Sequence, residues 1–286
     1  MSVLKSFVSN IIDFEATPKF KAIEQKMVDR DRRGFIEKVV SGSIGGSLFL
    51  MIPMQSSLFA EVLGDDKEAI SLEENKNKNY AFIVDVTGCI GCGICCVADR
   101  KENNVPDGQY RTWVERYVID IYDTVYVDSP DGGEKGYSTP RDDIKEEVKD
   151  AFFVPKLCNM CEEPSCVQVC PVGATFTSPD SFVLIDKNHC VACGYCVQAC
   201  PYGVRFINER TKTADKCTWC YHRVRKGKLP ACVNACPTGA RKFGDLNNPQ
   251  SEVSQIMASK KILTVLKKEL GNEPTLYYIG ASQEVV

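Results

Sequence analysis

One run in the second half of the chain decides how the rest can fold: Cys190-Val-Ala-Cys193-Gly-Tyr-Cys196-Val-Gln-Ala-Cys200-Pro201. Its final part, Cys-Val-x-x-Cys-Pro, occurs three times, at residues 166–171, 196–201 and 232–237. Each copy is preceded by a Cys-x2-Cys pair and followed by a glycine and then a phenylalanine. An internal repeat of this kind indicates one structural unit that the chain uses more than once.

The spacing Cys-x2-Cys-x2-Cys-x3-Cys-Pro is that of bacterial ferredoxins, in which three cysteines bind one iron–sulfur cluster and the fourth binds a second. Cysteines two residues apart in a tight loop reach neighbouring iron atoms, and the fourth lies one helical turn further on, facing away. The proline ends that helix, and the glycine lets the backbone turn close to the cluster. We therefore predict an α+β fold of tandem bacterial-type (2[4Fe-4S]) ferredoxin-like units with short strands, hairpins and small helices.

Length and charge restrict the class of protein. The 286 residues are enough for one large or two small domains. The formal net charge of −3 provides no basic field, so we expect no nucleic-acid partner. The sequence has sixteen cysteines, but Cys-x2-Cys pairs in regular series are more typical of metal or cluster ligands than of disulfides. We find no nicotinamide or flavin fingerprint and no nucleophile, so catalysis is expected to belong to partners.

The N-terminal part has features of an export signal. Arg32 and Arg33 precede Val39–Ala60, which is a run of twenty-two residues without a charge. This pattern resembles a twin-arginine signal, which carries folded proteins across the cytoplasmic membrane. We expect a folded protein on the extracytoplasmic (periplasmic) face of that membrane. Two alternatives stay open: the run is a buried helix, or it is an uncleaved N-terminal membrane anchor.

The rest of the chain divides by composition and by the cysteine repeat. The expected segments are a twin-arginine-like leader or membrane anchor at 1–63, a charged linker at 64–79, a ferredoxin-like unit with an insertion from 80–157 and 205–250, a second unit at 158–204, and a C-terminal helix and strand at 251–286. We also predict strands at 80–86, 111–127 and 275–279, hairpins at 176–186 and 205–215, and a helix at 141–150.

Four groups of cysteines follow one another along the chain. Their spacings are x2-x2, x2-x4-x3, x2-x2-x3 and x2-x11-x3, and they begin at Cys89, Cys158, Cys190 and Cys217. Shorter motifs accompany them: Arg111-Thr-Trp-Val114, Pro155-Lys-Leu-Cys-Asn159, Asp215-Lys-Cys-Thr-Trp-Cys220 and Tyr277-Tyr-Ile-Gly280. Together they resemble the four-cluster iron–sulfur subunits of dimethyl sulfoxide reductase-type and polysulfide reductase-type membrane complexes. Within this family the protein looks most like the iron–sulfur subunit of the Dsr complex linked to sulfite reduction.

The resemblance implies four sets of ligands, because groups one and four pair in this family, as do groups two and three. Set 1 is Cys89, Cys92, Cys95 and Cys236. Set 2 is Cys158, Cys161, Cys166 and Cys200. Set 3 is Cys190, Cys193, Cys196 and Cys170. Set 4 is Cys217, Cys220, Cys232 and Asp99. The implied cofactors are three [4Fe-4S] clusters and, in set 4, either an Asp-ligated [4Fe-4S] or a [3Fe-4S] cluster.

Set 4 departs from the family pattern at its fourth member. In the other groups the residue after the third cysteine is valine, and a cysteine follows three positions later; in group one these places hold Cys96 and Asp99. At about 100° per helical residue the two side chains point in different directions, so Cys96 is poorly placed to substitute. We expect Cys96 to be a buried, inert thiol. A carboxylate oxygen is a harder ligand than thiolate and holds the iron of a sulfide cluster less firmly.

The resemblance implies an electron-transfer subunit that is not an enzyme on its own. The implied partners are a polytopic quinone-reactive membrane subunit and a further redox subunit that carries molybdopterin or haem, in a respiratory complex for sulfur or related compounds. One alternative is a zinc-ribbon-type interaction protein, because Cys-x2-Cys pairs also bind zinc. Zinc, however, does not require the repeated run that ends in proline. The other alternative is an enzyme that reduces its substrate without partners.

Overall fold

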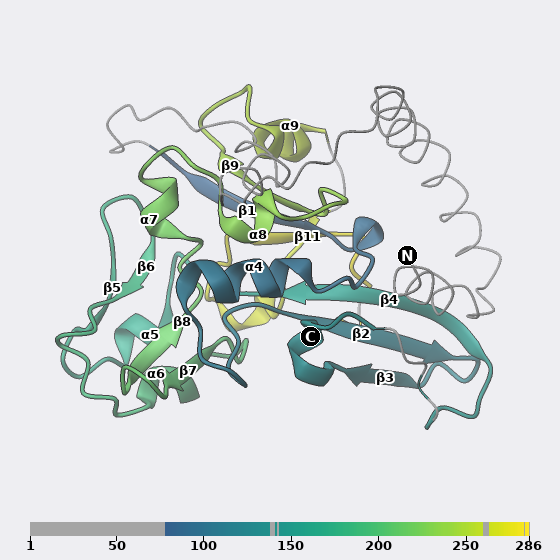
Figure 1. Ribbon diagram of the computed structural model, residues 1–286. Coiled ribbons are helices and arrows are strands. Elements are labelled where there is room, and N and C mark those ends of the chain that lie inside the picture. The colour runs from purple at the N-terminus through teal and green to yellow at the C-terminus, as the bar shows by residue number, and fades with distance from the viewer. Residues whose placement is uncertain (1–77, 138–140, 142, 260–262, 283, 286) are drawn as a thin grey trace, which may run out of the picture.

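The computed structural model describes residues 78–137, 141, 143–259, 263–282, 284 and 285. Their fold is α+β, with short helices between a four-stranded sheet, a three-stranded sheet and two hairpins (Figure 1). The predicted export signal and nearly all of the predicted linker lie outside the described residues. Among the helices of the described part, none is long and apolar enough to cross a membrane.

The four-stranded sheet joins the beginning of the described part to its end. The strand order is β10-β11-β1-β9, with β1 parallel to β11 and antiparallel to β9. The bounds are β1 Tyr80–Asp85, β9 Arg241–Asp245, β10 Leu263–Thr264 and β11 Leu276–Ile279. The predicted strands at 80–86 and 275–279 are thereby confirmed.

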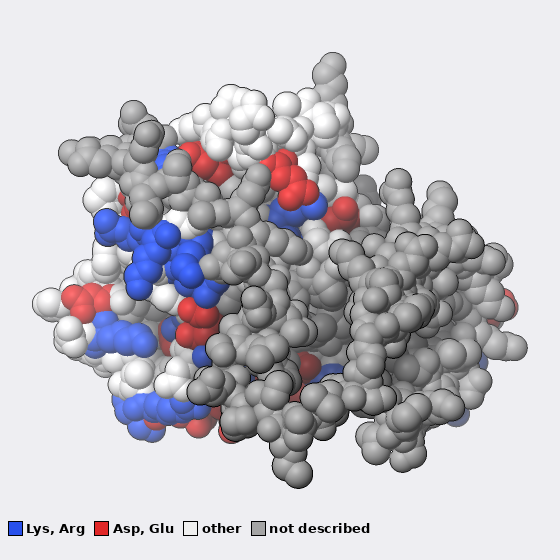
Figure 2. All heavy atoms as spheres, turned by 45° about the horizontal axis from the view of Figure 1, so that its top comes forward, with Lys and Arg blue, Asp and Glu red and all other residues white. Residues whose placement is uncertain are grey.

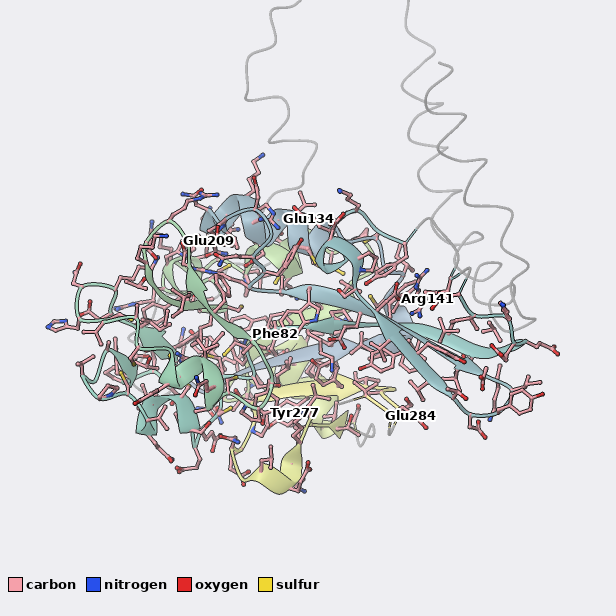
Figure 3. The ribbon with its side chains drawn as sticks, turned by 90° about the horizontal axis from the view of Figure 1, so that it is seen from below. Phe82, Glu134, Arg141, Glu209, Tyr277 and Glu284 are labelled. Atoms are coloured by element: carbon pink, nitrogen blue, oxygen red, sulfur yellow. The ribbon has the colours of Figure 1, made fainter. Side chains whose placement is uncertain are left out.

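The central strand β1 is buried on both faces. Because successive side chains of a strand point to opposite faces, one apolar strand can serve two layers. Ala81 and Ile83 face the small apolar cluster beneath α9 (Glu252–Ala258). On the other face, the ring centroid of Phe82 lies 5.6 Å from that of Trp219. Figure 3 shows Phe82 in the middle of the molecule.

The segment between the first two cysteine groups forms the three-stranded antiparallel sheet, in the order β3-β2-β4. Its bounds are β2 Trp113–Asp120, β3 Val125–Asp128 and β4 Val148–Lys156, with the 3-10 turn η3 at Pro130–Gly133. The helix predicted at 141–150 is wrong. Residues 141 and 143–147 contain no helix, and β4 begins at Val148. Pairing with β2 takes residues 148–150 out of the predicted helix.

The three copies of the Cys-Pro repeat fold alike. Their helices are α5 Ser165–Gln168, α6 Tyr195–Gln198 and α8 Ala231–Asn234, and each carries the third cysteine of its group as its second residue. Each helix ends after about one turn, because proline restricts the residue before it. The glycines that follow have φ between 64° and 66°, the left-handed conformation that favours glycine. The sequence prediction for this turn is confirmed.

The hairpins follow directly from these turns. The strands are β5 Thr175–Thr177 with β6 Val183–Ile185, and β7 Arg205–Asn208 with β8 Thr213–Lys216. The remaining short elements are α7 Tyr221–Val224, η2 Val86–Gly88 and η4 Lys268–Leu270. Both predicted hairpins are present.

Group one ends differently from the other three groups. Its helix α4 runs for ten residues, Ile94–Asn103, because no proline follows Asp99. It stops at Asn104, whose φ of 50° is left-handed. Asp99 therefore lies inside a helix, whereas the cysteines at the corresponding positions lie just beyond theirs.

We predict that Phe82→Ala lowers the stability of the fold by about 3–5 kcal/mol, the usual cost of deleting a phenylalanine side chain in a core. Phe82 is 0% exposed, whereas Phe176, the matched control, is 38% exposed. Near-UV circular dichroism on heating measures the melting temperature. It should fall for Phe82→Ala and change little for Phe176→Ala. A melting temperature of Phe82→Ala equal to that of the unchanged protein would show that the Phe82 side chain does not stabilise the core.

Candidate cluster-binding sites

The structure brings sets 1 and 2 together around two cavities. All four cysteines of set 2 line the first cavity: Cys158, Cys161, Cys166 and Cys200. All four cysteines of set 1 line the second: Cys89, Cys92, Cys95 and Cys236. In each cavity three cysteines come from one group and the fourth from another group, which is the pairing that the family resemblance implies.

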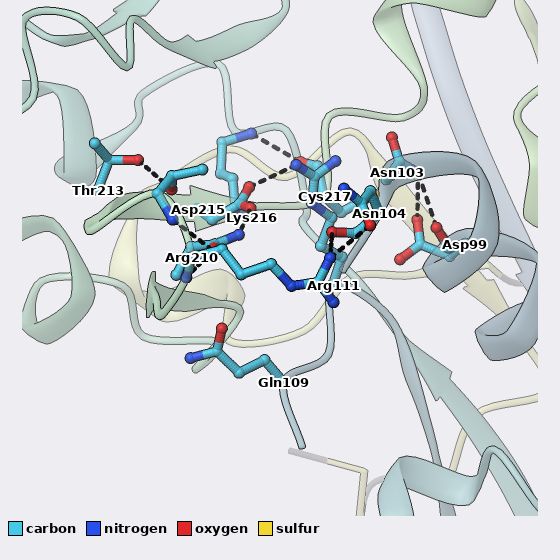
Figure 4. A network of polar contacts seen from close by, with 12 residues as sticks. Asp99, Asn103, Asn104, Gln109, Arg111, Arg210, Thr213, Asp215, Lys216 and Cys217 are labelled. Atoms are coloured by element: carbon cyan, nitrogen blue, oxygen red, sulfur yellow. Dashed lines mark hydrogen bonds and ion pairs between the residues drawn. The ribbon is translucent and has the colours of Figure 1, made fainter. Parts of the chain in front are cut away.

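Set 4 converges on Asp99. This residue is only 4% exposed, and it acts electrostatically on Cys217, Cys220 and Cys232. Burial raises the pKa of the Asp99 carboxyl to about 6. One turn further along α4, the Nδ2 of Asn103 donates to Asp99 Oδ1 over 2.9 Å (Figure 4). The same Nδ2 lies 3.6 Å from the sulfur of Cys220. Asp99 thus lies near the three cysteines that the family resemblance groups with it.

Cys96 faces away from set 4. Its sulfur lies 3.9 Å from that of Cys95 and 3.6 Å from the carbonyl oxygen of Gly132 in η3. The hydrogen bond to Cys95, together with burial, raises the pKa of the Cys96 thiol well above its ordinary value. The predicted burial of Cys96 is confirmed, and its role as a thiol that is not a ligand stays a prediction.

Set 3 lies nearest to the surface. Cys193 is exposed, and Cys170 and Cys190 are half-buried. The backbone N–H of Thr175 donates to the sulfur of Cys170 over 3.4 Å, and that of Ala214 donates to the sulfur of Cys190 over 3.3 Å. Backbone amides that point at sulfur are among the interactions that adjust the reduction potential of an iron–sulfur cluster.

The donor sets fit iron–sulfur clusters better than single metal ions. Burial raises the pKa of Cys89 and of Cys161 to about 12, so metal coordination is needed to hold these sulfurs as thiolates. The cysteines of sets 1 and 2 surround a cavity. Within the described ranges, no three His, Cys, Asp or Glu side chains close on a point that would hold one ion.

Two arginines lie beside the cysteines and are not among the site residues predicted from the sequence. Arg205 lines the cavity of set 2, and Arg241 lines the cavity of set 1. They are 4% and 2% exposed. Nη2 of Arg205, and Nε and Nη1 of Arg241, have no hydrogen-bond partner among the described residues. Buried cationic groups of this kind suit an anionic cluster. The repeat carried a signal for both: each arginine stands five positions after the fourth cysteine of its group.

The four sets can be ordered as a row, 1, 4, 2, 3, by the buried side chains that act electrostatically on two neighbouring sets. Arg241 acts electrostatically on cysteines of sets 1 and 4. Cys217 of set 4 lies near Cys158 of set 2, whose carbonyl oxygen accepts a hydrogen bond from Trp219 Nε1 over 2.9 Å. Arg205 acts on cysteines of sets 2 and 3. Each set is therefore linked to the next by a buried side chain that interacts with both.

These features define an iron–sulfur protein of the ferredoxin type, and comparison with known proteins agrees. The family described as "4Fe-4S dicluster domain" matches residues 149–246. The sequence is 36% identical to a tetrathionate reductase subunit from Salmonella typhimurium over 260 residues, which are 91% of this protein and 92% of the relative. It is 38% identical to a putative dimethyl sulfoxide reductase iron–sulfur subunit from Halobacterium salinarum over 219 residues, covering 71% and 79%. It is 35% identical to a polypeptide of polysulfide reductase from Wolinella succinogenes over 205 residues, covering 71% and 94%.

The protein belongs to the family of iron–sulfur subunits of tetrathionate, polysulfide and dimethyl sulfoxide reductase-type complexes. The resemblance seen in the motifs is confirmed at this level. Members of the family are electron-transfer subunits of multi-subunit reductases and not the catalytic subunits. The branch within the family and the individual ligands stay predictions.

We predict that Asp99→Cys changes the cluster of set 4 and that Cys96→Ser does not. The first substitution places a thiolate where Asp99 faces Cys217, Cys220 and Cys232. Electron paramagnetic resonance of the oxidised protein measures the result: a three-iron signal, or the signal of an Asp-ligated cluster, should be lost or altered. If Cys96→Ser alters the signal and Asp99→Cys leaves it intact, Cys96 is the ligand and our assignment is wrong.

Proposed function

We propose that this protein relays electrons through four iron–sulfur sites, between a quinone-reactive membrane subunit and another redox subunit of a respiratory oxidoreductase for sulfur or related compounds. The observation that carries the proposal is that buried side chains link sets 1, 4, 2 and 3 in succession through electrostatic interactions. Reversible one-electron transfer is the chemistry that such clusters supply when bound.

The protein's own residues have three tasks in this function. The cysteines hold the sites, and backbone N–H groups such as that of Trp219, 3.4 Å from the sulfur of Cys217, donate to the sulfurs. Buried arginines balance the negative charge of the thiolates. Cys217 is 3% exposed and Cys232 is 4% exposed, so the fold excludes water from the middle of the row.

We infer two ferredoxin-like units, one holding sets 1 and 4 and the other holding sets 2 and 3. Pairing of β1 with β9, and packing of α4 on α8, support the first unit, which combines 80–157 and 205–250. Packing of α5 on α6, with Ser165 Oγ donating to the carbonyl oxygen of Ala199 over 3.0 Å, supports the second at 158–204. Three [4Fe-4S] clusters and the unusual cluster of set 4 would complete them.

Exposed apolar side chains at both ends of the row support two partners. Near set 1 these side chains are Ile90, Ile94 and Val97, each more than 40% exposed. Near set 3 they include Val191 at 60% and Tyr195 at 57%. Apolar groups left in water beside a redox site are typical of a surface that a partner covers. One end would meet the polytopic membrane subunit and the other the molybdopterin- or haem-bearing subunit.

The basic loop after α7 has two possible roles, a docking surface for an acidic partner or a solvated loop. Figure 2 shows Lys and Arg side chains gathered on the side of the molecule that carries α7, with acidic side chains among them. His222 Nε2 and Arg223 Nη1 both contact the Glu102 carboxylate, at 2.7 Å and 3.1 Å. Part of this charge is thus neutralised within the protein, so we favour a solvated loop over a binding site for an acidic partner.

Purification of the tagged protein from gently solubilised membranes tests the function. We expect a brown complex whose broad visible absorption bleaches with dithionite, together with a multi-helix membrane protein identified by mass spectrometry. A colourless, zinc-containing product would support the zinc-ribbon alternative instead. A soluble monomer with all its clusters would contradict the proposed partners, and reduction of tetrathionate or polysulfide by that monomer would make it an enzyme.

We also propose that Arg32 and Arg33 direct export of the folded, cluster-loaded protein to the periplasmic face of the membrane. The support is the sequence pattern of paired arginines before an uncharged run. Replacing both with lysine should retain the protein in the cytoplasm, as measured by cell fractionation. Arg30→Lys, two positions before Arg32, is the matched control and should be exported normally. Normal export of the double variant, expressed without partner subunits, would refute the signal. Expression without partners is needed because a partner's own signal could carry the protein across the membrane.

A further inference from the structure

Arg205 and Arg241 occupy the same position in two copies of the repeat, at the first residue of β7 and of β9. We propose that each arginine is a positive charge shared by two neighbouring cluster sites and raises the reduction potential of both clusters. This inference rests on the proposed function, because it requires clusters in the four sets. In the remaining copy of the repeat the same position holds Thr175 at the start of β5.

Arg241 lies between sets 1 and 4. It acts most strongly on Cys95 of set 1 and then on Cys232 of set 4. Nη2 donates to Thr112 Oγ1 over 2.8 Å, while Nε and Nη1 have no hydrogen-bond partner in the described part of the protein. Two of the three guanidinium nitrogens therefore have no protein oxygen as partner in the described part, and the side chain lines the cavity of set 1.

Arg205 has the equivalent place between sets 2 and 3. It acts on Cys166 and Cys158 of set 2 and on Cys196 of set 3. Its Nη1 lies 3.3 Å from Thr175 Oγ1, and its Nη2 has no partner among the described residues. Each arginine thus uses one nitrogen to contact a threonine hydroxyl and keeps at least one other nitrogen without a partner among the described residues.

Among the described residues, two of the three other buried cations are paired with carboxylates, whereas the third, Lys216, donates to the carbonyl oxygen of Cys217 over 2.9 Å. Arg111 Nη2 lies 2.7 Å from Asp215 Oδ1, both of them buried (Figure 4). Lys156 Nζ lies 3.5 Å from Glu115 Oε2. Among the residues that the structure describes, neither Arg205 nor Arg241 forms an ion pair with a carboxylate. Arg241 also acts electrostatically on the Asp99 carboxyl of set 4, after Arg111. The charges of Arg205 and Arg241 therefore remain available to the sulfur sets.

The location of these charges determines their effect. A buried positive charge without a counterion would be strongly unfavourable, so thiolate-bound clusters on both sides are its natural counterions. Reduction adds one electron to a cluster, and a nearby positive charge favours the more negative state. Burial limits screening by water and salt, so the effect reaches both neighbouring sites. Net charge around a cluster is one of the determinants of its potential.

The rival explanation is that each arginine only fixes local structure through its threonine contact. Glutamine separates the two explanations, because it can still donate to the threonine hydroxyl but has no charge. Lysine keeps the charge and loses the planar guanidinium. The test therefore uses Arg205→Gln, Arg241→Gln, Arg205→Lys and Arg241→Lys in the intact complex. Arg225→Gln removes the same charge from an exposed position and is the matched control.

Redox titration followed by electron paramagnetic resonance, with iron content measured in parallel, gives the readout. We expect each glutamine variant to lower the midpoint potentials of two clusters, with a different pair for each arginine. The lysine variants should stay close to wild type, and Arg225→Gln should shift none. Wild-type protein without iron would refute the proposed function itself.

Two results would overturn the inference alone: iron-loaded glutamine variants with unchanged potentials, or an equal shift of all four clusters. If a glutamine variant loses iron, the lysine variant shows whether the site requires the positive charge or the guanidinium group itself. Full iron and wild-type potentials in the lysine variant support a requirement for charge. Loss of iron in both variants assigns the arginine a structural role.

Discussion

Negatively charged sulfur atoms must be held close together inside a small protein, and most of the structure depends on this constraint. Burial raises the pKa of Cys89 to about 12 by disfavouring its thiolate form, so the polypeptide without metal resists such a site. Iron is one source of compensating charge. Backbone N–H groups directed at Cys170, Cys190 and Cys217 are another, and the buried guanidinium groups of Arg205 and Arg241 are the third.

Because cysteine sites occupy so much of the interior, a small aromatic group supplies much of the ordinary packing. Four rings make up this group, and the centroids of those in contact lie 5.6–6.3 Å apart. They belong to Phe82 in β1, Phe243 in β9, Phe182 just before β6, and Trp219 between two cysteines. Trp219 also donates its indole N–H to the carbonyl oxygen of Cys158. The residue that fills the core therefore also fixes the junction between set 4 and set 2.

One local difference in sequence changes the geometry of one site. The fourth cysteines of three groups are followed by proline, and their helices stop within about one turn. Asp99 is followed by Arg100, and α4 continues to Asn103. This longer helix places Asn103 one turn beyond Asp99, where its amide contacts both the carboxylate and Cys220. Group one thus differs from the repeat in two linked ways: aspartate stands where the other groups have cysteine, and the helix is longer because no proline follows.

The sequence by itself determined the elements whose cause is local. The cysteine spacing, the Cys-Pro stops and the glycines after them specify the short helices and turns, and alternation in residues 80–86 specifies β1. The pairing of cysteine groups came from family resemblance, since spacing alone does not say which groups meet. Tertiary structure decided the rest. The last part of the predicted helix, residues 148–150, belongs to β4 instead, because β2 offers β4 a long antiparallel partner. The position of Arg205 and Arg241 between sets emerged only in three dimensions, because an arginine in a strand reveals its charge partners only when segments distant in sequence are brought together.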